Sequence, residues 1–366
     1  MTDNKVLILG GTGFVARHLI KQLLATNYAS KIRAVDKQLP ATSYMSDEFK
    51  AMYTNEKVEY MQGNLSNEAH VKKAFTGHEW THVVNLAAET RCGQDEATYK
   101  QMILVLSVNC AKEALNHKSI KTYIEFSTAQ VYDSGKKPSK ESDKLKPWTV
   151  LAKYKKEAED ELKKLQGLPL IIVRTAVIYG PGDLNGLMPR IICASTYTVS
   201  KEKMKMLWTG DLALNTVHVS DVARATCHLF EKGQKGSVYN LCDKNSTDQE
   251  KLNKILEQLF GIDTGFHGSM LSSLAKLNIK LAAETANESH MSPWGEMLKA
   301  SEIKFTPLSP YIDIELLSNN ALSVDGSAIE ATGFKYEQPN LTKALLQEEI
   351  DYYTTLNLFP KYTPLK

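Results

Sequence analysis

The sequence predicts an α/β protein with a Rossmann-type, doubly wound parallel sheet and a smaller, mixed C-terminal lobe that binds the substrate. The first observation behind this prediction is a rhythm in which short apolar runs alternate with amphipathic segments of helical length. The second is that these runs are apolar almost throughout, which is typical of strands buried on both faces of a parallel sheet. Together they predict right-handed βαβ crossovers.

Each element of this rhythm is bounded by a change of pattern. The expected strands are residues 6–9, 32–35, 58–61, 82–86, 123–126, 170–173 and 238–241. The expected helices between them are residues 15–25, 68–75, 99–116 and 152–165. After Gly180-Pro181-Gly182 the rhythm loosens. There we expect helices at 187–194, 220–230, 249–259 and 341–353, short strands at 204–208 and 215–219, and few regular elements between 264 and 320.

Composition and charge narrow the class of protein. The chain has 366 residues and a formal net charge of +2, so its charge does not predict a nucleic-acid partner. The start lacks the pattern of a secretion signal, and no stretch approaches the roughly 20 apolar residues of a membrane helix, so we expect no membrane partner. Five scattered cysteines without CxxC spacing favour a reducing, cytoplasmic location, and the sequence shows no cluster of metal ligands.

A glycine-rich turn joins the first expected strand to the first expected helix. Gly10 and Gly13 permit a tight turn and a close approach by a pyrophosphate, and the small Ala16 lets the helix pack on the sheet. Thr12, Phe14 and Val15 complete the turn. The start of the helix then offers free N–H groups and a positive dipole end to phosphates. This context predicts a dinucleotide site.

An acidic residue ends the next strand, twenty residues after Ala16. Asp36 stands where a carboxylate bonds the ribose hydroxyls of a dinucleotide. A negative charge at this position repels a 2′-phosphate, which favours NAD over NADP as the cofactor. Lys37 beside it keeps NADP open as the less favoured alternative.

Taken in order, these and further motifs resemble the extended short-chain dehydrogenase/reductase family, the NAD-dependent epimerase/dehydratase group. The resemblance covers about residues 4–245, with a weaker echo at 320–356. It implies a cofactor domain at 1–182 with part of 204–245, and a substrate lobe at 183–203 and 246–366. Beyond the glycine-rich turn and Asp36, it implies cofactor contacts by Asn64, Leu65, Leu86, Ala87, Ala88, Asn109, Ser127, Lys155, Thr175 and Val177.

The resemblance also implies a catalytic set. In the family a Tyr is the acid/base, a Lys four residues later holds the ribose and lowers the pKa of that Tyr, and a Ser or Thr orients the substrate. Thr128 matches the hydroxyl position and Lys155 the Lys position. The Tyr position then falls on Leu151, which cannot transfer a proton, so the chain resembles an atypical member. Tyr154 is one substitute, although its side chain points about 60° away from that line on the helix.

Other side chains are candidate proton carriers, namely Tyr132, Lys153, Glu89 and Cys193. Two functions therefore stay open. In the first, the chain is an NAD-dependent oxidoreductase or epimerase/dehydratase-type enzyme with an altered catalytic set, acting on a small hydroxyl or carbonyl substrate. In the second, it is a catalytically inactive NAD-binding regulatory or scaffold protein.

Substrate class and oligomeric state are less constrained. Sugar-nucleotide members of the family clamp the substrate diphosphate with arginines of the C-terminal lobe, whereas the last arginine here is Arg224, which weakens that reading. Apolar residues of the lobe either line a pocket for an apolar substrate or form the lobe's own core: Phe266, Met270, Leu271, Leu274, Leu277, Ile279, Met291, Trp294 and Met297. Relatives pair through helices that correspond to 99–116 and 152–165. The second is rich in Lys and Glu, which fits a monomer as well as a homodimer.

Overall fold

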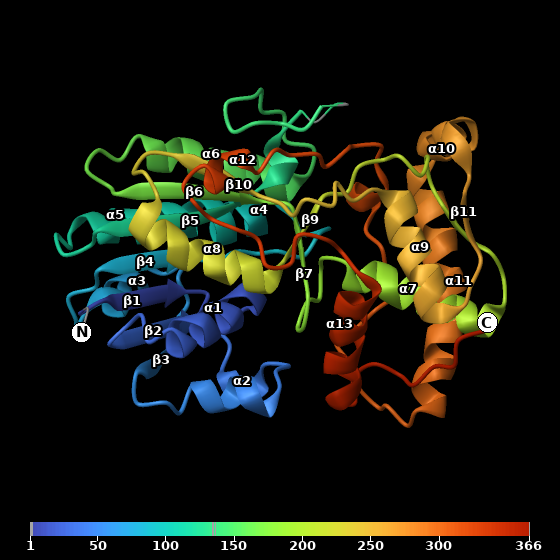
Figure 1. Ribbon diagram of the computed structural model, residues 1–366, viewed down its shortest axis with the longest axis horizontal. Helices are drawn as coiled ribbons and strands as arrows, with labels where there is room; N and C mark the ends of the chain where they lie inside the picture. Colours follow the sequence, from blue (N-terminus) through green and yellow to red (C-terminus); the bar gives the residue numbers. More distant parts are fainter. Residues whose placement is uncertain (1–2, 134, 136, 366) are drawn as a thin grey trace.

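A parallel sheet organises the first two-thirds of the chain. The computed structural model describes residues 3–133, 135 and 137–365. Within them, a seven-stranded sheet has the order β10-β6-β5-β4-β1-β2-β3, with every pairing parallel (Figure 1). Its strands are β1 (Lys5–Leu9), β2 (Lys31–Asp36), β3 (Val58–Gln62), β4 (His82–Asn85), β5 (Thr122–Thr128), β6 (Leu170–Thr175) and β10 (Val238–Leu241). This confirms the predicted fold class.

The sheet reverses its winding between β1 and β4, because β2 and β3 continue on one side of β1 while β4 lies on the other. In open α/β sheets such a switch point leaves a crevice at the carboxyl ends of the strands. The Gly-rich turn and the ends of β2, β4 and β5 all lie at that edge. The topology therefore places the predicted site residues together.

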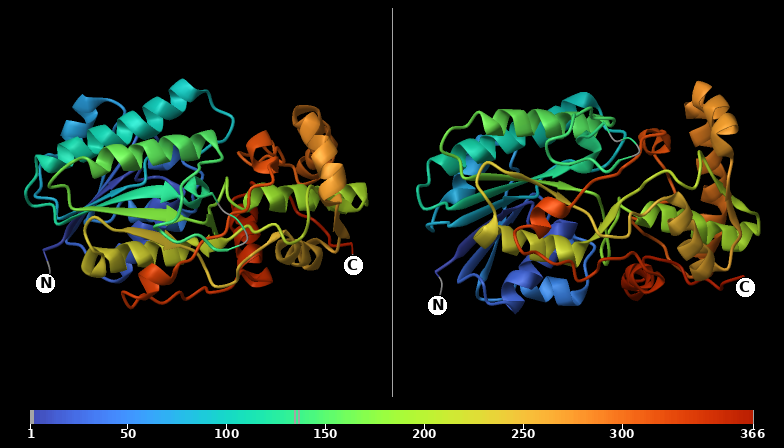
Figure 2. Two further views of the ribbon diagram at one scale, coloured as in Figure 1. Left: turned by 90° about the horizontal axis from the view of Figure 1, so that it is seen from above. Right: turned by 45° about the horizontal axis from the view of Figure 1, so that its top comes forward.

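Helices cover both faces of the sheet (Figures 1 and 2). On one side α1 (Phe14–Ala25) packs against α8 (Val219–Lys232), next to the short η1 (Pro40–Thr42) and α2 (Asp47–Met52). On the other side lie α3 (Glu68–Phe75), α5 (Leu106–Leu115) and α6 (Val150–Lys163). The expected helix 99–116 is a composite of α4 (Glu96–Tyr99), a π-helical turn η2 (Lys100–Val105) and α5. Pro-free, strongly amphipathic sequence explains why these helices were predictable.

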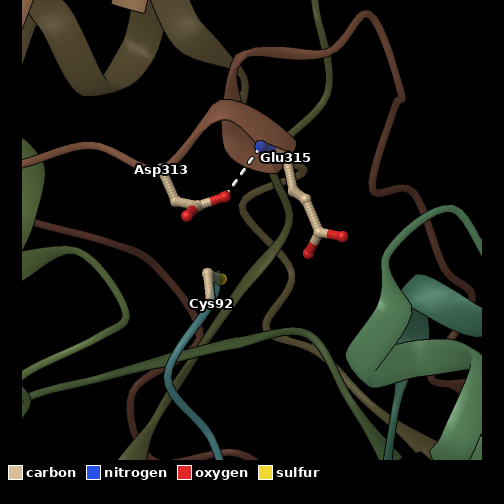
Figure 3. A group of neighbouring side chains, drawn as sticks. All are labelled: Cys92, Asp313 and Glu315. Atoms are coloured by element: carbon tan, nitrogen blue, oxygen red, sulfur yellow. Dashed lines mark hydrogen bonds between the residues drawn. The ribbon is translucent and has the colours of Figure 1, made fainter. Parts of the chain in front are cut away.

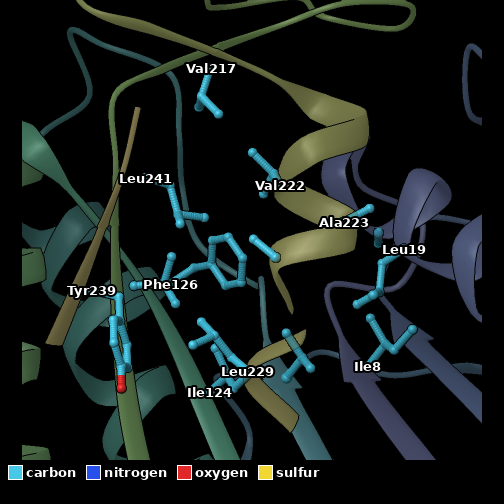
Figure 4. Packing of buried hydrophobic residues seen from close by; sticks show 14 of the residues in the cluster. Ile8, Leu19, Ile124, Phe126, Val217, Val222, Ala223, Leu229, Tyr239 and Leu241 are labelled. Carbon is cyan, nitrogen blue, oxygen red and sulfur yellow. The ribbon is translucent and has the colours of Figure 1, made fainter. Parts of the chain in front are cut away.

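The packing between the sheet and the α1–α8 pair is dry and apolar (Figure 4). Ile8 and Ile124 of the sheet, and Leu19, Val222 and Leu229 of the helices, have essentially no exposed surface. Burying a side chain of this size contributes about 1.5–3 kcal/mol. This core fixes the position of α1, and with it the Gly-rich turn.

A second core holds the C-terminal lobe. It joins α7 (Met188–Ser200), α9 (Gln249–Phe260), α11 (Ile279–Ala300) and α13 (Lys343–Thr355), on the right of Figure 1. The remaining elements are short: η3 (Ala129–Val131), β7 (Val177–Tyr179) paired with β9 (Thr216–His218), β8 (Met204–Met206) paired with β11 (Thr264–Phe266), α10 (Gly268–Leu277), η4 (Ile314–Leu317) and α12 (Ser327–Glu330). Among the described residues, no helix is both long enough and apolar enough to cross a membrane.

The region 264–320 corrects one expectation, because it contains β11, α10, the 22-residue α11 and η4 rather than few regular elements. Its apolar residues divide into two groups. Trp294 and Met297 belong to the second core, whereas Met270, Leu274 and Leu277 are 59–85% exposed. The exposed group recurs at helical spacing along α10, but its side chains are exposed rather than buried in a core.

Candidate functional site

The Gly-rich turn is built so tightly that side chains would not fit at its base. Gly10 has φ +81°, and a Cβ there would lie 2.7 Å from the backbone nitrogen of Ala87. Both Gly10 and Gly11 donate their N–H groups to the carbonyl of Val35 at 2.9 Å. The turn is thereby clamped between the ends of β2 and β4.

The start of α1 is open, in contrast. Gly13 is exposed, and a Cβ on it would meet only the carbonyl oxygen of Gly10, at 3.2 Å. As the N-cap of α1 it provides no side chain to bond the first helical N–H groups. These groups and the positive end of the helix dipole face open space, which fits a pyrophosphate.

Asp36 lies beside this turn. Its Oδ2 accepts a hydrogen bond from the N–H of Thr12 at 3.1 Å, and its Oδ1 accepts one from the N–H of Gln38, also at 3.1 Å. The carboxylate therefore faces the glycine-rich turn rather than turning away from it. The residues present fit a dinucleotide whose pyrophosphate lies on α1 and whose ribose reaches Asp36.

Further predicted cofactor residues lie at the same edge of the sheet. Leu86, Ala87 and Ala88 follow β4 and are half-exposed, while Val177 begins β7 and Thr175 ends β6 next to Thr128. Two predicted residues have side-chain atoms engaged elsewhere. The side chain of Leu65 is buried in a sheet core, and that of Asn64 accepts from Ser66 in its own turn.

A buried polar network lies beneath the carboxyl end of β5. Glu125 accepts hydrogen bonds from Asn85 and from Ser107, both at 2.8 Å, and Lys155 Nζ lies 3.9 Å from it. Ser107, rather than the half-exposed Asn109 two residues later, is the α5 side chain that bonds these strands. No local pattern pointed to Ser107, because a lone Ser in a helix is common.

Lys155 is held inside this network. Its Nζ donates to the carbonyl of Phe126 at 2.6 Å. Burial lowers the pKa of Lys155, while the charges of Glu125 and Glu159 oppose that change. The side chain of Lys155 therefore lies buried just below the end of β5, bonded to the backbone of that strand.

A second buried pair stands next to it. Arg174 donates to both carboxylate oxygens of Glu159, at 2.9 and 2.5 Å, and both side chains are at most 1% exposed. Ser127, a predicted cofactor contact, donates its hydroxyl to Glu159 at 2.6 Å. Its side chain therefore faces the network, on the opposite face of β5 from that of Thr128.

Thr128 ends β5 and is only partly buried. Its Oγ1 accepts from the N–H of Gln130, and the side chain of Gln130 accepts from the hydroxyl of Thr149 at 2.8 Å. Thr149 is the N-cap of α6, and its Oγ1 accepts from the N–H of Ala152. The candidate catalytic hydroxyl is thus tied to the first turn of α6, where Leu151 lies.

Tyr154 is directed away from Thr128's loop. Its hydroxyl bonds Glu96 of α4 at 3.1 Å, and its ring stacks on that of Tyr99. Burial and Glu96 raise the pKa of Tyr154, whereas a proton carrier at neutral pH needs a lowered one. Lys153 also pairs with Glu96, at 3.3 Å, and is exposed. The geometry does not support either residue as the acid/base.

Tyr132 and Cys193 are buried structural groups. The hydroxyl of Tyr132 donates to Asn240 at 2.7 Å and accepts from Arg174 at 2.8 Å, and burial above all raises its pKa to about 12. The thiol of Cys193 donates to the carbonyl of Pro310, and burial raises its pKa to about 12 as well. Both stay protonated near neutral pH.

Glu89 is locked by a neighbour. Arg91 forms a two-pronged bond to it, at 2.9 and 2.8 Å. Burial raises the pKa of Glu89, but the opposing effects of Arg91 and of the nearby charge of Lys37 are larger together. The net result is a lowered pKa. A paired carboxylate of this kind is a weak base.

The structure adds a carboxylate group that sequence reasoning missed. Three side chains converge at one place, namely Cys92, Asp313 and Glu315 (Figure 3). The sulfur of Cys92 and one carboxylate oxygen from each acid all lie within 4.8 Å of one another. Cys92 follows β4, whereas the two acids flank the start of η4. More than 200 residues separate them in sequence, so no local spacing could have revealed the group.

Comparisons with known proteins place the chain in a family. The family model described as "NAD dependent epimerase/dehydratase family" matches residues 6–242. The chain belongs to this family. A dTDP-D-glucose 4,6-dehydratase of Bos taurus is 26% identical over 300 residues, covering 79% of this chain and 76% of the relative.

Two solved structures show the same fold. The Bordetella bronchiseptica enzyme WbmG, in complex with NAD and UDP, has a TM-score of 0.70 at 17% identity, covering 98% of this chain and 97% of its own. A UDP-glucuronic acid 4-epimerase from Bacillus cereus, in complex with UDP-glucuronic acid and NAD, has a TM-score of 0.69 at 17% identity, with coverages of 96% and 99%.

Proposed function

We propose that this protein binds NAD and catalyses an NAD-dependent oxidation at a sugar carbon of a nucleotide sugar. The observation that carries the proposal is the open N-terminus of α1 at Gly13, with the carboxylate of Asp36 bonded beside it. Family membership and the NAD named in the solved neighbours support the same cofactor. The carboxylate of Asp36 opposes a 2′-phosphate, so NADP should bind less well.

The chain's own residues then have separate roles. NAD, when bound, supplies a hydride acceptor. Lys155, beneath the end of β5, would hold the ribose hydroxyls through its ammonium group. Thr128 would orient the reacting hydroxyl of the sugar through Oγ1, which is fixed by the N–H of Gln130. Leu151, which the resemblance to the family motif places at the Tyr position, offers no proton-transfer group.

Arg190 supports a phosphate-bearing substrate. The other arginines are engaged: four pair with carboxylates, and Arg17 donates to the carbonyls of Thr12 and Tyr44. Half-buried Arg190, on the first turns of α7, enters no ion pair with the residues that the structure describes. A guanidinium without an acid partner is suited to a diphosphate. This offsets the earlier argument from the lack of arginines after Arg224.

Several coarser expectations are proposed with the function. All five cysteines are free thiols, which supports a cytoplasmic location. The sheet region would hold the cofactor and the C-terminal lobe the substrate, as the two separate cores suggest. The charged outer face of α6 leaves monomer and homodimer both open.

The test combines binding with turnover. Thermal shifts with NAD, NADP and their reduced forms should show the largest stabilisation by NAD or its reduced form. NAD-loaded protein incubated with dTDP-glucose or UDP-glucose should give a keto-sugar product, detected by chromatography and mass spectrometry. Binding without turnover would favour the inactive regulatory or scaffold alternative. Equal failure of all four dinucleotides would refute the cofactor assignment.

A further inference from the structure

The proposed reaction needs a proton acceptor, and the start of α6 supplies none of its own. Leu151 is apolar, Tyr154 and Lys153 bond Glu96 on the α4 side, and the remaining candidates are paired or buried in structural roles. A group from another part of the chain has to serve if the enzyme is active.

Glu315 reaches this place from the C-terminal lobe. Its Oε1 accepts a hydrogen bond from the N–H of Val150, the first residue of α6, at 3.1 Å. Its Oε2 is buried and has no hydrogen-bond partner among the residues that the structure describes. One oxygen thus anchors the carboxyl group next to Leu151, and the other has no partner among the described residues that would compete for a proton.

The same turn connects Glu315 to the candidate hydroxyl of Thr128. Thr149, directly before Val150, bonds Gln130, whose N–H bonds Thr128. Two hydrogen bonds, one to the side chain and one from the backbone of Gln130, therefore tie the turn that anchors Glu315 to the residue that would orient the substrate. Val150, which anchors Glu315, directly precedes Leu151, the residue that the family resemblance places at the Tyr position.

The surroundings of Glu315 favour a carboxyl group that changes protonation state. Asp313 precedes it at the start of η4, and Cys92 faces it from the loop after β4 (Figure 3). Burial, together with the charge of Glu315, raises the pKa of Tyr99 in α4. Burial raises the pKa of Glu315, the charge of Asp313 adds to this, and the N–H of Val150 opposes it. Burial, with Asp313 and Glu315, raises the pKa of Cys92 to about 12, so the thiol does not compete as a base.

We propose that Glu315 is the proton carrier that replaces the missing Tyr. The proposal rests on the function proposed above. In the oxidation, the O–H bond of the sugar hydroxyl breaks and its proton passes to Glu315, while the C–H electron pair leaves as hydride to NAD and the C=O bond forms. The reverse transfers restore the starting state in any later reduction.

The experiment compares Glu315→Gln with Asp313→Asn in the full-length, NAD-loaded protein, using dTDP-glucose and UDP-glucose as probes. Glu315→Gln keeps the acceptor for Val150 but cannot take a proton, and should lower kcat about 10²–10⁴-fold without changing NAD binding or circular dichroism. Asp313→Asn keeps the η4 cap but removes a negative charge beside Glu315, so the acid limb of its pH profile should move to lower pH.

Two further measurements separate a proton carrier from a structural residue. Difference infrared spectroscopy across the acid range should show a protonated-carboxyl band that Glu315→Gln removes, whether or not substrate is present. Leu151→Tyr in the Glu315→Gln background should restore part of the turnover, because it returns the family's acid/base.

The outcomes are distinct. Active wild type with an equally active Glu315→Gln variant, or a band that survives this substitution, overturns the role of Glu315 alone. Wild type that binds NAD but turns over neither sugar nucleotide overturns the proposed function, and the role of Glu315 with it.

Discussion

Two alanine substitutions in the same turn should have opposite effects on folding and on cofactor binding. In Gly13→Ala, the backbone angles of φ −66° and ψ 167° suit alanine, and the new Cβ meets only one atom at 3.2 Å. Alanine lowers the conformational entropy of the unfolded chain, which stabilises the fold, but it is a poorer N-cap than glycine, which destabilises it. These two effects are about 0.5–1 kcal/mol each and nearly cancel. Stability should hold, while the methyl group occupies the approach of the pyrophosphate. We expect NAD affinity to fall at least tenfold, about 1.4 kcal/mol.

Gly10→Ala is the contrasting variant. Its φ of +81° costs an alanine about 1–2 kcal/mol, and the contact at 2.7 Å with the backbone of Ala87 adds about 1–3 kcal/mol. The expected loss is about 2–5 kcal/mol of unfolding free energy. Urea unfolding followed by circular dichroism measures stability, and calorimetric titration measures NAD binding. Unchanged NAD affinity in Gly13→Ala, or wild-type stability in Gly10→Ala, would refute the geometry proposed for the glycine-rich turn, which we call the cradle.

Three further changes test other parts of the structure. Asp36→Asn should weaken NAD binding about 10–100-fold and narrow the preference for NAD over NADP, because charge-assisted bonds to the ribose are lost. Titration with both cofactors measures the two affinities, and an unchanged ratio of the NAD affinity to the NADP affinity would contradict this prediction. Glu159→Gln should lower the free energy of unfolding in urea by about 3–5 kcal/mol, because it leaves the buried charge of Arg174 uncompensated. Glu161→Gln, at an exposed ion pair, should lower it by less than about 1 kcal/mol, and similar losses in both variants would count against the buried network. Burial above all lowers the pKa of His18 to about 4, below the ordinary 6.5, so the unfolded chain binds more protons than the folded chain between these pH values. The free energy of unfolding should therefore fall by about 3 kcal/mol as the pH drops from 6.5 to 4. His18→Gln should remove that slope, and an equal slope in both proteins would argue against the shift.

The sheet and the cradle were predictable because their signals are local. The apolar runs that became β1, β2 and β5 lie within the sequence next to the turns that they position, and Gly10 and Asp36 need only a strand before them to acquire meaning. Family resemblance added Thr128 and Lys155, which lie at the same sheet edge.

Other parts of the site depend on long-range contacts, which leave no local pattern. Glu315 bonds Val150 from 165 residues away, and Cys92 meets it only through the fold. Ser107 bonds Glu125 across two elements, so the sequence pointed instead to Asn109. The exposed apolar residues of α10 were misread because burial was assumed for them.

The bond between Glu315 and the first turn of α6 also has a consequence for synthesis on the ribosome. All seven strands of the sheet lie before residue 242, so the nucleotide-binding layer can assemble while the remaining third of the chain is still being made. The start of α6 lacks its distant acceptor until residue 315 has emerged. A nascent or truncated chain could therefore acquire a cofactor cradle well before it acquires a complete reaction centre, which would delay chemistry until translation is nearly finished.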